Sequence, residues 1–232
     1  MRTREQIDII KQTESDPFSI PSAISTTEIN KLLNFYFSSN NVIQKNTGPK
    51  VLKIEEHNPL LTPVIDRLKN ITGDFDIRYA HFFDVTMPHM IHNDDLCEYP
   101  ESAKAFTIPL KIYSNNSDVK LVVFDQHYYG GPVKFVNGAN TKDWNVYYNT
   151  FLTDYANVDG VNNKGIDTEF KNKYLTHLND SWLQGLSINA ALPWKVRDIL
   201  CFDSLALHCS TDFRNVGIER KIGLSIFTLR KQ

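Results

Sequence analysis

His92-Asn93-Asp94 opens the pattern that decides how this sequence is interpreted, and Phe202-Asp203-Ser204-Leu205-Ala206-Leu207-His208 completes it. Residues two apart on an extended strand point to the same side, so His92 and Asp94 can reach one ion while Asn93 points away. The apolar run before His208 predicts an adjacent strand that brings this histidine to the same ion. Two imidazoles and one carboxylate on one side of a metal leave the other side open, as in non-haem Fe(II) sites.

The other histidines do not have a carboxylate at the same spacing. His89 would pair with Ile91, which cannot bind a metal, and Asp95 is out of phase with His92. Each piece of the pattern, taken alone, is more often an ordinary partly buried residue. The occurrence of all the pieces together, in the order expected for a metal site, favours His92, Asp94 and His208 as ligands. Four further histidines have no acidic residue two positions on: His57, His81, His127 and His177.

Hydrophobic spacing predicts helices in the first third of the chain and strands after it. The capping-box sequence Ser25-Thr26-Thr27-Glu28 predicts a helix over 26–38. Apolar residues at steps of three and four predict a second helix over 60–72. Residues 1–22 are expected to be irregular or a short helix. Runs of branched and aromatic residues predict strands at 76–85, 105–113, 120–125, 196–202 and 221–229.

This order of elements predicts a mainly β (α+β) fold, an antiparallel sandwich with helices packed outside it. The 232 residues are enough for one domain of that kind. We expect a single domain over 1–232, with a helical lead-in at 1–75, a core at 76–229 and an insertion at 137–192.

The insertion at 137–192 interrupts the run of strands and is rich in aromatic residues. Its second half, 167–184, is predicted to be helical because Phe170, Tyr174, Leu178 and Trp182 follow at steps of four. An insertion of this length is uncommon unless it is a lid or binding loop, although packing on the sandwich edge is a compatible alternative. The expected substrate-binding residues are Trp144, Tyr147, Tyr148 and Tyr155.

The composition is that of an ordinary globular protein, with 41% hydrophobic and 22% charged residues. A net charge of −2 without a long basic run makes nucleic acid an unexpected partner. Three cysteines are too few for a disulfide framework or a thiolate zinc site. The sequence has no long apolar run, so neither a secretion signal nor a membrane span is expected, and the cytoplasm is the expected location. Nothing in the sequence indicates an oligomeric state.

With these motifs the chain resembles the Fe(II)/2-oxoglutarate-dependent oxygenase superfamily, and within it the phytanoyl-CoA dioxygenase-like branch, over 76–229. The resemblance implies a double-stranded β-helix core, that is, a jelly roll of the cupin-like type. The residues that carry it are His92-Asn93-Asp94, Leu121-Val122-Val123-Phe124-Asp125-Gln126, Asp198-Ile199-Leu200-Cys201-Phe202-Asp203-Ser204 before His208, and Arg220-Lys221-Ile222-Gly223-Leu224-Ser225.

The resemblance also implies that 2-oxoglutarate chelates Fe(II), and that a basic residue on the final strand binds its distal carboxylate. Arg220 has the family's spacing after His208, Lys221 on the opposite strand face is the second choice, and Arg214 is less favoured. The family often has serine two residues after this arginine, whereas here the next serine downstream is Ser225. Ser210 and Ser225 resemble hydroxyl positions that help to hold the co-substrate. Tyr79, Thr107 and Lys111 could face the same cavity, but strand parity does not decide this, and ordinary lining of the barrel is the more common role of such residues.

The activity implied is hydroxylation of a small organic substrate by O2, with release of succinate and CO2 and with ascorbate as a stimulant. Asp94 argues against the related halogenases, which have a small residue there. The insertion carries four lysines against six acidic residues, so a small metabolite is expected, with a free amino acid or peptidyl side chain next. The alternatives are a cupin-type metalloenzyme that does not use 2-oxoglutarate, a non-catalytic jelly-roll module that binds a metal or ligand, and a zinc hydrolase, which would not need Arg220.

Overall fold

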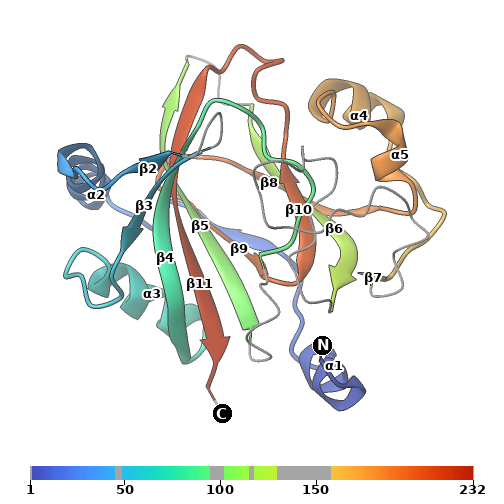
Figure 1. Cartoon of the computed structure of the whole chain (residues 1–232), viewed down its shortest axis with the longest axis horizontal. Helices are drawn as coiled ribbons and strands as arrows, with labels where there is room; N and C mark the ends of the chain where they lie inside the picture. The colour runs from blue at the N-terminus through green and yellow to red at the C-terminus, as the bar shows by residue number, and fades with distance from the viewer. Residues whose placement is uncertain (1, 45–48, 95–101, 115–117, 130–157, 232) are drawn as a thin grey trace.

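Two antiparallel sheets face each other in the computed structural model, which describes residues 2–44, 49–94, 102–114, 118–129 and 158–231 (Figure 1). The seven-stranded major sheet has the order β1 (Phe18–Ile20), β9 (Ile199–Asp203), β5 (Ser102–Tyr113), β11 (Arg220–Arg230), β4 (Phe75–Val85), β3 (Lys50–Ile54) and β2 (Ile43–Gln44). The minor sheet has the order β10 (Ala206–Ser210), β6 (Lys120–Tyr128) and β7 (Val158–Asp159), with β8 (Ile188–Pro193) also paired to β6. The predicted jelly-roll fold class is confirmed.

The interior between the sheets is lined by apolar side chains of both. Val123 and Leu192 come from the minor sheet, and Phe202 and Phe227 come from the major sheet. Each of these side chains is buried, which contributes about 1.5–3 kcal/mol to folding for a fully buried large apolar residue. This interior is where residues from distant parts of the sequence meet.

Helices cover the opposite face of the major sheet, on the left in Figure 1. Helix α2 (Thr26–Ser38) begins with the predicted capping box, in which the Ser25 hydroxyl accepts from the backbone N–H of Glu28 and the Glu28 carboxylate accepts from that of Ser25. Helix α3 (Thr62–Thr72) follows, as predicted. Both pack their apolar sides against the sheet in one core cluster, which includes Leu32, Leu68 and Phe82.

The segment 1–75 supplies strands as well as helices. After helix α1 (Arg4–Lys11), β1 pairs with β9, while β3 pairs with β4. These strands extend the major sheet at both sides and cover the backbone edges of its central strands. The helical lead-in expected at 1–75 therefore also supplies strands of the major sheet.

The described part of the insertion packs on the outer face of the minor sheet. A single helix was expected over 167–184, but the structure has two, α4 (Thr168–Tyr174) and α5 (Asp180–Leu183). The first helix ends at its C-cap Leu175, and the side chain of Asn179 caps the start of the second. The apolar side chains at four-residue steps still pack together, and β8 at the end of the insertion is a strand of the core. The insertion's side chains at these steps belong to one apolar cluster on the outer face of β6 and β10. These side chains are Phe170, Tyr174, Leu178 and Trp182.

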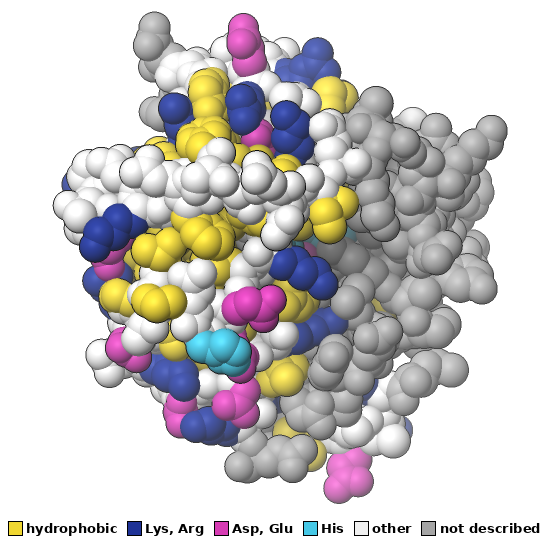
Figure 2. Space-filling view, turned by 60° about the vertical axis from the view of Figure 1, so that its left-hand side comes forward, with side chains coloured by type: hydrophobic (Ala, Val, Ile, Leu, Met, Phe, Trp, Pro, Cys, Tyr) yellow, Lys and Arg dark blue, Asp and Glu magenta, His cyan; other side chains and the backbone are white. Residues whose placement is uncertain are grey.

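Figure 2 shows the face that carries α2 and α3, where hydrophobic side chains lie among Lys, Arg, Asp and Glu side chains. Phe37 and Ile43 are among the exposed large apolar residues. Among the described residues, no helix is both long and apolar enough to cross a membrane.

Candidate metal centre

His92 and His208 are brought together by a short antiparallel bridge at the edge of β10. The backbone N–H of His92 donates to the carbonyl of His208 at 3.0 Å, and the reverse bond is 2.8 Å. The backbone N–H of Asp94 donates to the carbonyl of Ser204 at 2.9 Å. These backbone hydrogen bonds fix the positions of His92, Asp94 and His208, although the stretch around His92 forms only an isolated bridge.

The side chains of His92, Asp94 and His208 converge on one point. One ligand atom from each residue can be chosen so that all three lie within 4.8 Å of one another. His92 Nε2 is 3.6 Å from one carboxylate oxygen of Asp94, and His208 Nε2 is 3.2 Å from the other. All three residues are nearly inaccessible to solvent. A buried carboxylate between two imidazole nitrogens is costly without a cation.

Both imidazoles present Nε2 to the site. Nδ1 of His92 lies 2.7 Å from the carbonyl of Met90, and Nδ1 of His208 lies 3.0 Å from the carbonyl of Ala206. Because a carbonyl only accepts, each Nδ1 carries the proton, and Nε2 keeps a lone pair for a metal. Two neutral imidazoles and one carboxylate are the donor set of a facial Fe(II) site, so the residues fit this metal.

His89 lies beside the triad, although its spacing in the sequence excluded it as a ligand. Its Nδ1 is 3.0 Å from Nε2 of His92, and the two rings are perpendicular with centroids 4.0 Å apart. The carbonyl of His89 also accepts from the backbone N–H of Ser210 at 3.3 Å. No spacing rule could have found this contact, because it depends on how the segment before His92 turns.

Lys221 faces the interior of the sandwich, on the same side as the triad. Its ammonium donates to the hydroxyl of Ser210 at 2.8 Å and lies 4.0 Å from the ring centre of Trp194 and 5.0 Å from that of Phe213. No carboxylate pairs with it in the part of the chain that the structure describes. Burial lowers the pKa of Lys221 to about 7. An ammonium has three donor hydrogens, so a buried one with a single hydroxyl partner can still donate to an anion.

Arg220, the first choice for the co-substrate carboxylate, points the other way. Its guanidinium forms two hydrogen bonds with Asp84, of 2.7 and 2.5 Å, and lies over the ring of Tyr113. Tyr36 on α2 donates to the same carboxylate at 2.8 Å. Hydrogen bonds to Asp84 and burial raise the pKa of Tyr36, with burial as the larger cause. The structure thus places Arg220 under the helices and not in the interior.

Lys111 is also on the helix side of the major sheet. Its ammonium lies 4.7 Å from the ring centre of Tyr113 and 5.9 Å from that of Phe37. The cause is a bulge in β5: Gly223 of β11 pairs with Pro109, but Ile222 pairs with Lys111. The extra residue reverses the alternation of side chains after it. Lys111 is therefore not brought to the triad, although the sequence had left it as a candidate for the co-substrate cavity.

The remaining candidates lie toward the interior. Ser225 pairs with Thr107 on β5, before the bulge, so both are on the face that carries Lys221. Tyr79 stacks on Phe227, another residue of that face, with ring centres 4.5 Å apart. Burial, together with the negative charge of Asp94, raises the pKa of Tyr79. The four expected substrate residues, Trp144, Tyr147, Tyr148 and Tyr155, lie outside the described residues.

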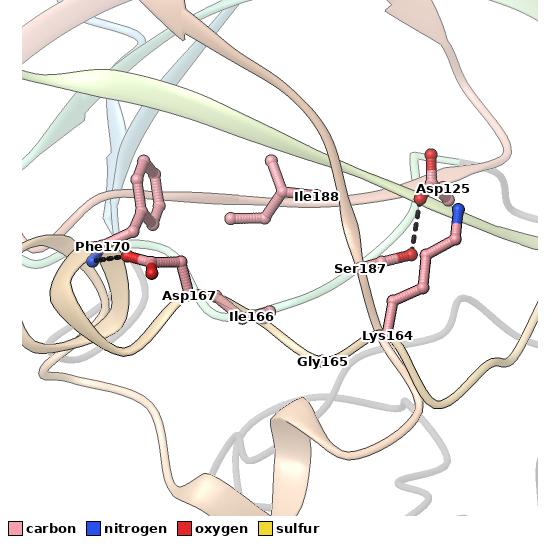
Figure 3. Close-up of a pocket in the computed structure, with 8 residues that line it drawn as sticks. All are labelled: Asp125, Lys164, Gly165, Ile166, Asp167, Phe170, Ser187 and Ile188. Carbon is pink, nitrogen blue, oxygen red and sulfur yellow. Dashed lines mark hydrogen bonds between the residues drawn. The ribbon is translucent and has the colours of Figure 1, made fainter.

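A cavity of about 390 Å³ lies beside α4, away from the triad (Figure 3). One end is polar, where the hydroxyl of Ser187 donates to Asp125 at 2.5 Å and Lys164 extends toward the same carboxylate. The apolar side chains Phe170 and Ile188 also line it, and the carboxylate of Asp167 lies beside Phe170. None of the metal-ligand candidates lines this cavity, so it is a feature of the outer face and not part of the metal centre.

Comparisons with known proteins identify other structures that have this fold. No family model matches the sequence, and no curated protein gives a significant match. Among solved structures, the non-heme alpha-ketoglutarate-dependent epimerase SnoN from nogalamycin biosynthesis is similar with a TM-score of 0.54 at 8% identity, covering 97% of this chain and 82% of SnoN.

Two further solved structures are similar over almost the whole chain. A Pseudomonas putida prolyl-4-hydroxylase has a TM-score of 0.52 at 8% identity, with 98% of this chain and 100% of that chain covered. HygX from Streptomyces hygroscopicus, solved with nickel and 2-oxoglutarate bound, has a TM-score of 0.51 at 12% identity, with 100% of this chain and 88% of HygX covered. The chain has the jelly-roll fold of the non-heme iron, 2-oxoglutarate-dependent oxygenases.

Proposed function

We propose that this chain is an Fe(II)- and 2-oxoglutarate-dependent dioxygenase that hydroxylates a small organic substrate and releases succinate and CO2. The observation that carries the proposal is the link from the triad to the buried ammonium. His208 and Ser210 are two apart on β10 and therefore point to the same side, and Ser210 accepts from Lys221. The two strand positions from which these side chains extend toward the metal and anion positions are roughly 7 Å apart. A five-carbon keto diacid is of comparable length.

His92, Asp94 and His208 would hold the iron. The carbonyls of Met90 and Ala206 orient the two imidazoles, and the backbone bond to Ser204 positions the carboxylate. Bound there, Fe(II) would supply the activation of dioxygen for oxidation of a C–H bond, coupled to decarboxylation of the keto acid. Burial of all three ligands keeps water away from the site.

Lys221 would bind the distal carboxylate of 2-oxoglutarate, in the role that the sequence favoured for Arg220. A carboxylate would give the ammonium the counter-charge that it does not have among the described residues. The Ser210 hydroxyl, which accepts from Lys221, can donate its own proton to the same carboxylate. Arg220 is already engaged with Asp84 on the other face. Ser225, Thr107 and Tyr79 would line the co-substrate cavity.

Hydroxylation is the proposed reaction because Asp94 keeps the carboxylate ligand that halogenating relatives are without. The solved structures with this fold include an epimerase and a prolyl hydroxylase, so the fold alone does not choose the reaction. HygX has been solved with hygromycin B bound, which is an example of a small-molecule ligand on this fold. For this chain we propose a small metabolite as substrate, with Trp144, Tyr147, Tyr148 and Tyr155 contributing to its binding.

The proposal is tested by succinate formation from 2-oxoglutarate with Fe(II), ascorbate and air. Wild-type protein is expected to form succinate slowly without a substrate and faster with the right member of a metabolite library. His208→Ala should abolish both activities, whereas His57→Ala, at an exposed histidine, should change neither. Succinate formation that persists in His208→Ala after rigorous purification would refute the proposed metal site.

A further inference from the structure

The ammonium of Lys221 is enclosed by aromatic rings. Trp194 lies against it at 4.0 Å and Phe213 at 5.0 Å, both measured to the ring centres. Lys221 and Trp194 are almost completely buried, with exposed fractions of 3% and 2%. Cation–π attraction explains why the ammonium lies over the faces of these rings, because an ammonium without a carboxylate partner is stabilised there.

The Trp194 ring is held in this position by the sheet beneath it. Gly223, two residues after Lys221 on β11, has no side chain, and a Cβ there would lie 3.0 Å from Cη2 of Trp194 and 2.5 Å from Cζ of Phe83. Phe83 and Trp194 themselves pack edge to face, with centroids 5.7 Å apart. The backbone N–H of Trp194 donates to the carbonyl of Val119 at 2.8 Å. The indole is therefore fixed from both sides.

The indole N–H of Trp194 has no partner among the described residues, although the nitrogen is inaccessible to solvent. Buried indole donors normally find an acceptor, and a buried donor without one is costly. The Lys221 ammonium lies over the same indole ring, but it is itself a donor and cannot satisfy the indole N–H. Two buried donors, one charged and one neutral, thus lie next to each other without a shared acceptor.

We propose that Trp194 is a second donor to the co-substrate, its indole N–H binding the same distal carboxylate as Lys221. The inference rests on the proposed function and adds a residue that no motif in the sequence indicated. Because the ammonium is 4.0 Å from the ring centre, the indole nitrogen is about 4–6 Å from Nζ by the size of the ring, and one carboxylate can bridge donors at that separation. Trp194 then orients the carboxylate, while Lys221 supplies the charge.

If Trp194 only packs against Lys221 and does not donate to the carboxylate, the expected effects of its substitution are different. If Trp194 only covers Lys221, phenylalanine at 194 keeps most of the aromatic face and should keep co-substrate affinity. If the indole N–H binds the carboxylate, phenylalanine loses that bond, and 2-oxoglutarate affinity should fall about 5- to 50-fold. Metal binding should be unchanged in both cases, because Trp194 is not among the residues that converge on the metal position.

The direct test is the indole ¹⁵N–¹H spectrum of Zn(II)-loaded protein titrated with 2-oxoglutarate. The chain has three tryptophans, and Trp194→Phe assigns the resonance of interest by removing it. We expect this resonance to shift downfield in proportion to bound 2-oxoglutarate. Trp182→Phe, on the outer face of the minor sheet, serves as the matched control and should leave 2-oxoglutarate affinity within twofold of wild type. Thermal unfolding and zinc stoichiometry of each variant confirm that it is folded and loaded.

The outcomes separate the two proposals. If 2-oxoglutarate saturates the protein while the Trp194 resonance stays in place and Trp194→Phe binds as tightly as wild type, the role of Trp194 is refuted and the proposed function stands. If the wild-type protein binds the metal but no 2-oxoglutarate, both proposals are refuted. A downfield shift together with weaker binding by Trp194→Phe supports both.

Discussion

Arg220 and Lys221 are adjacent in the sequence and point to opposite faces of β11. Arg220 forms an ion pair with Asp84 beneath α2, and Lys221 donates to Ser210 in the interior. The two cations therefore have separate roles, one in holding the helices to the sheet and one, we propose, in binding the co-substrate. This separation makes each role testable by a single substitution.

Lys221→Met should weaken 2-oxoglutarate binding strongly. Charge-assisted hydrogen bonds contribute about 1.5–3 kcal/mol, which corresponds to roughly 10- to 150-fold in affinity. The measurement is calorimetric titration of metal-loaded protein with 2-oxoglutarate. Arg220→Met is the matched control and should bind within threefold of wild type. If Arg220→Met loses affinity and Lys221→Met does not, the assignment of the two residues is reversed.

Arg220→Met should instead destabilise the fold. It leaves the carboxylate of Asp84, which is 5% exposed, with Tyr36 as its remaining side-chain partner among the described residues. Breaking such a pair costs up to 3–5 kcal/mol when both groups are buried, and we expect about 1–3 kcal/mol here because Arg220 is partly exposed. Urea unfolding measures this change. The double variant with Asp84→Asn should recover part of the loss, and an additive loss in the double variant would argue against the pair.

The affinity for 2-oxoglutarate should fall as the pH rises through neutrality. In the free protein burial lowers the pKa of Lys221 to about 7, so the ammonium is charged below this pH and becomes neutral above it. Binding of a carboxylate requires the charged form, and affinity should decline by up to tenfold per pH unit above the pKa. Titrations between pH 6 and 9 measure the slope. Lys221→Met should show no such slope, and an equal slope in wild type and variant would assign it to another group.

The same pKa shift has the opposite effect on stability. The pKa of Lys221 is lower in the folded protein than its usual value, so the unfolded chain binds more protons between about pH 7 and 10. This residue therefore makes unfolding less favourable as the pH rises through that window. Comparing urea unfolding of wild type and Lys221→Met at pH 7 and pH 9 isolates the effect. Lys221→Met should be more stable than wild type at pH 7, by a margin that shrinks at pH 9, and a margin independent of pH would contradict the shift.

Gly223→Ala should damage both the fold and the co-substrate site. The added methyl would lie 2.5 Å from Phe83 and 3.0 Å from Trp194, so at least one ring must move. Overpacking of this kind costs about 1–3 kcal/mol. Thermal unfolding and 2-oxoglutarate titration should both change, since Trp194 covers Lys221. Stability and affinity both equal to wild type would show that the rings move freely.

The sequence predicted the three residues that converge at the candidate metal centre, and also the helices α2 and α3, because those signals are local. His92 and Asp94 have a fixed spacing, and the residues of the capping box beginning at Ser25 lie within one turn of helix. Only His208 needed a long-range assumption, namely that its strand returns beside His92. The bridge between the two backbones confirms that assumption.

The choice between Arg220 and Lys221 could not be made from the sequence. Strand parity separates them, but β11 is buried on both faces, with Ile222 and Leu224 toward the helices and Phe227 toward the minor sheet. A strand of this kind does not show which face is the interior. The direction of Lys111 could not be determined from the sequence for a related reason, because a bulge that depends on pairing with β11 reverses it.

The proposed metal and co-substrate site is tested most directly by the visible spectrum of the protein with Fe(II) and 2-oxoglutarate under anaerobic conditions. Chelation of the iron by the keto acid should produce a weak charge-transfer band. The band should be absent in His92→Ala and Asp94→Ala, and should need much more 2-oxoglutarate in Lys221→Met than in Arg220→Met. A band of equal intensity and equal 2-oxoglutarate dependence in all of these variants would contradict the assignment of the site.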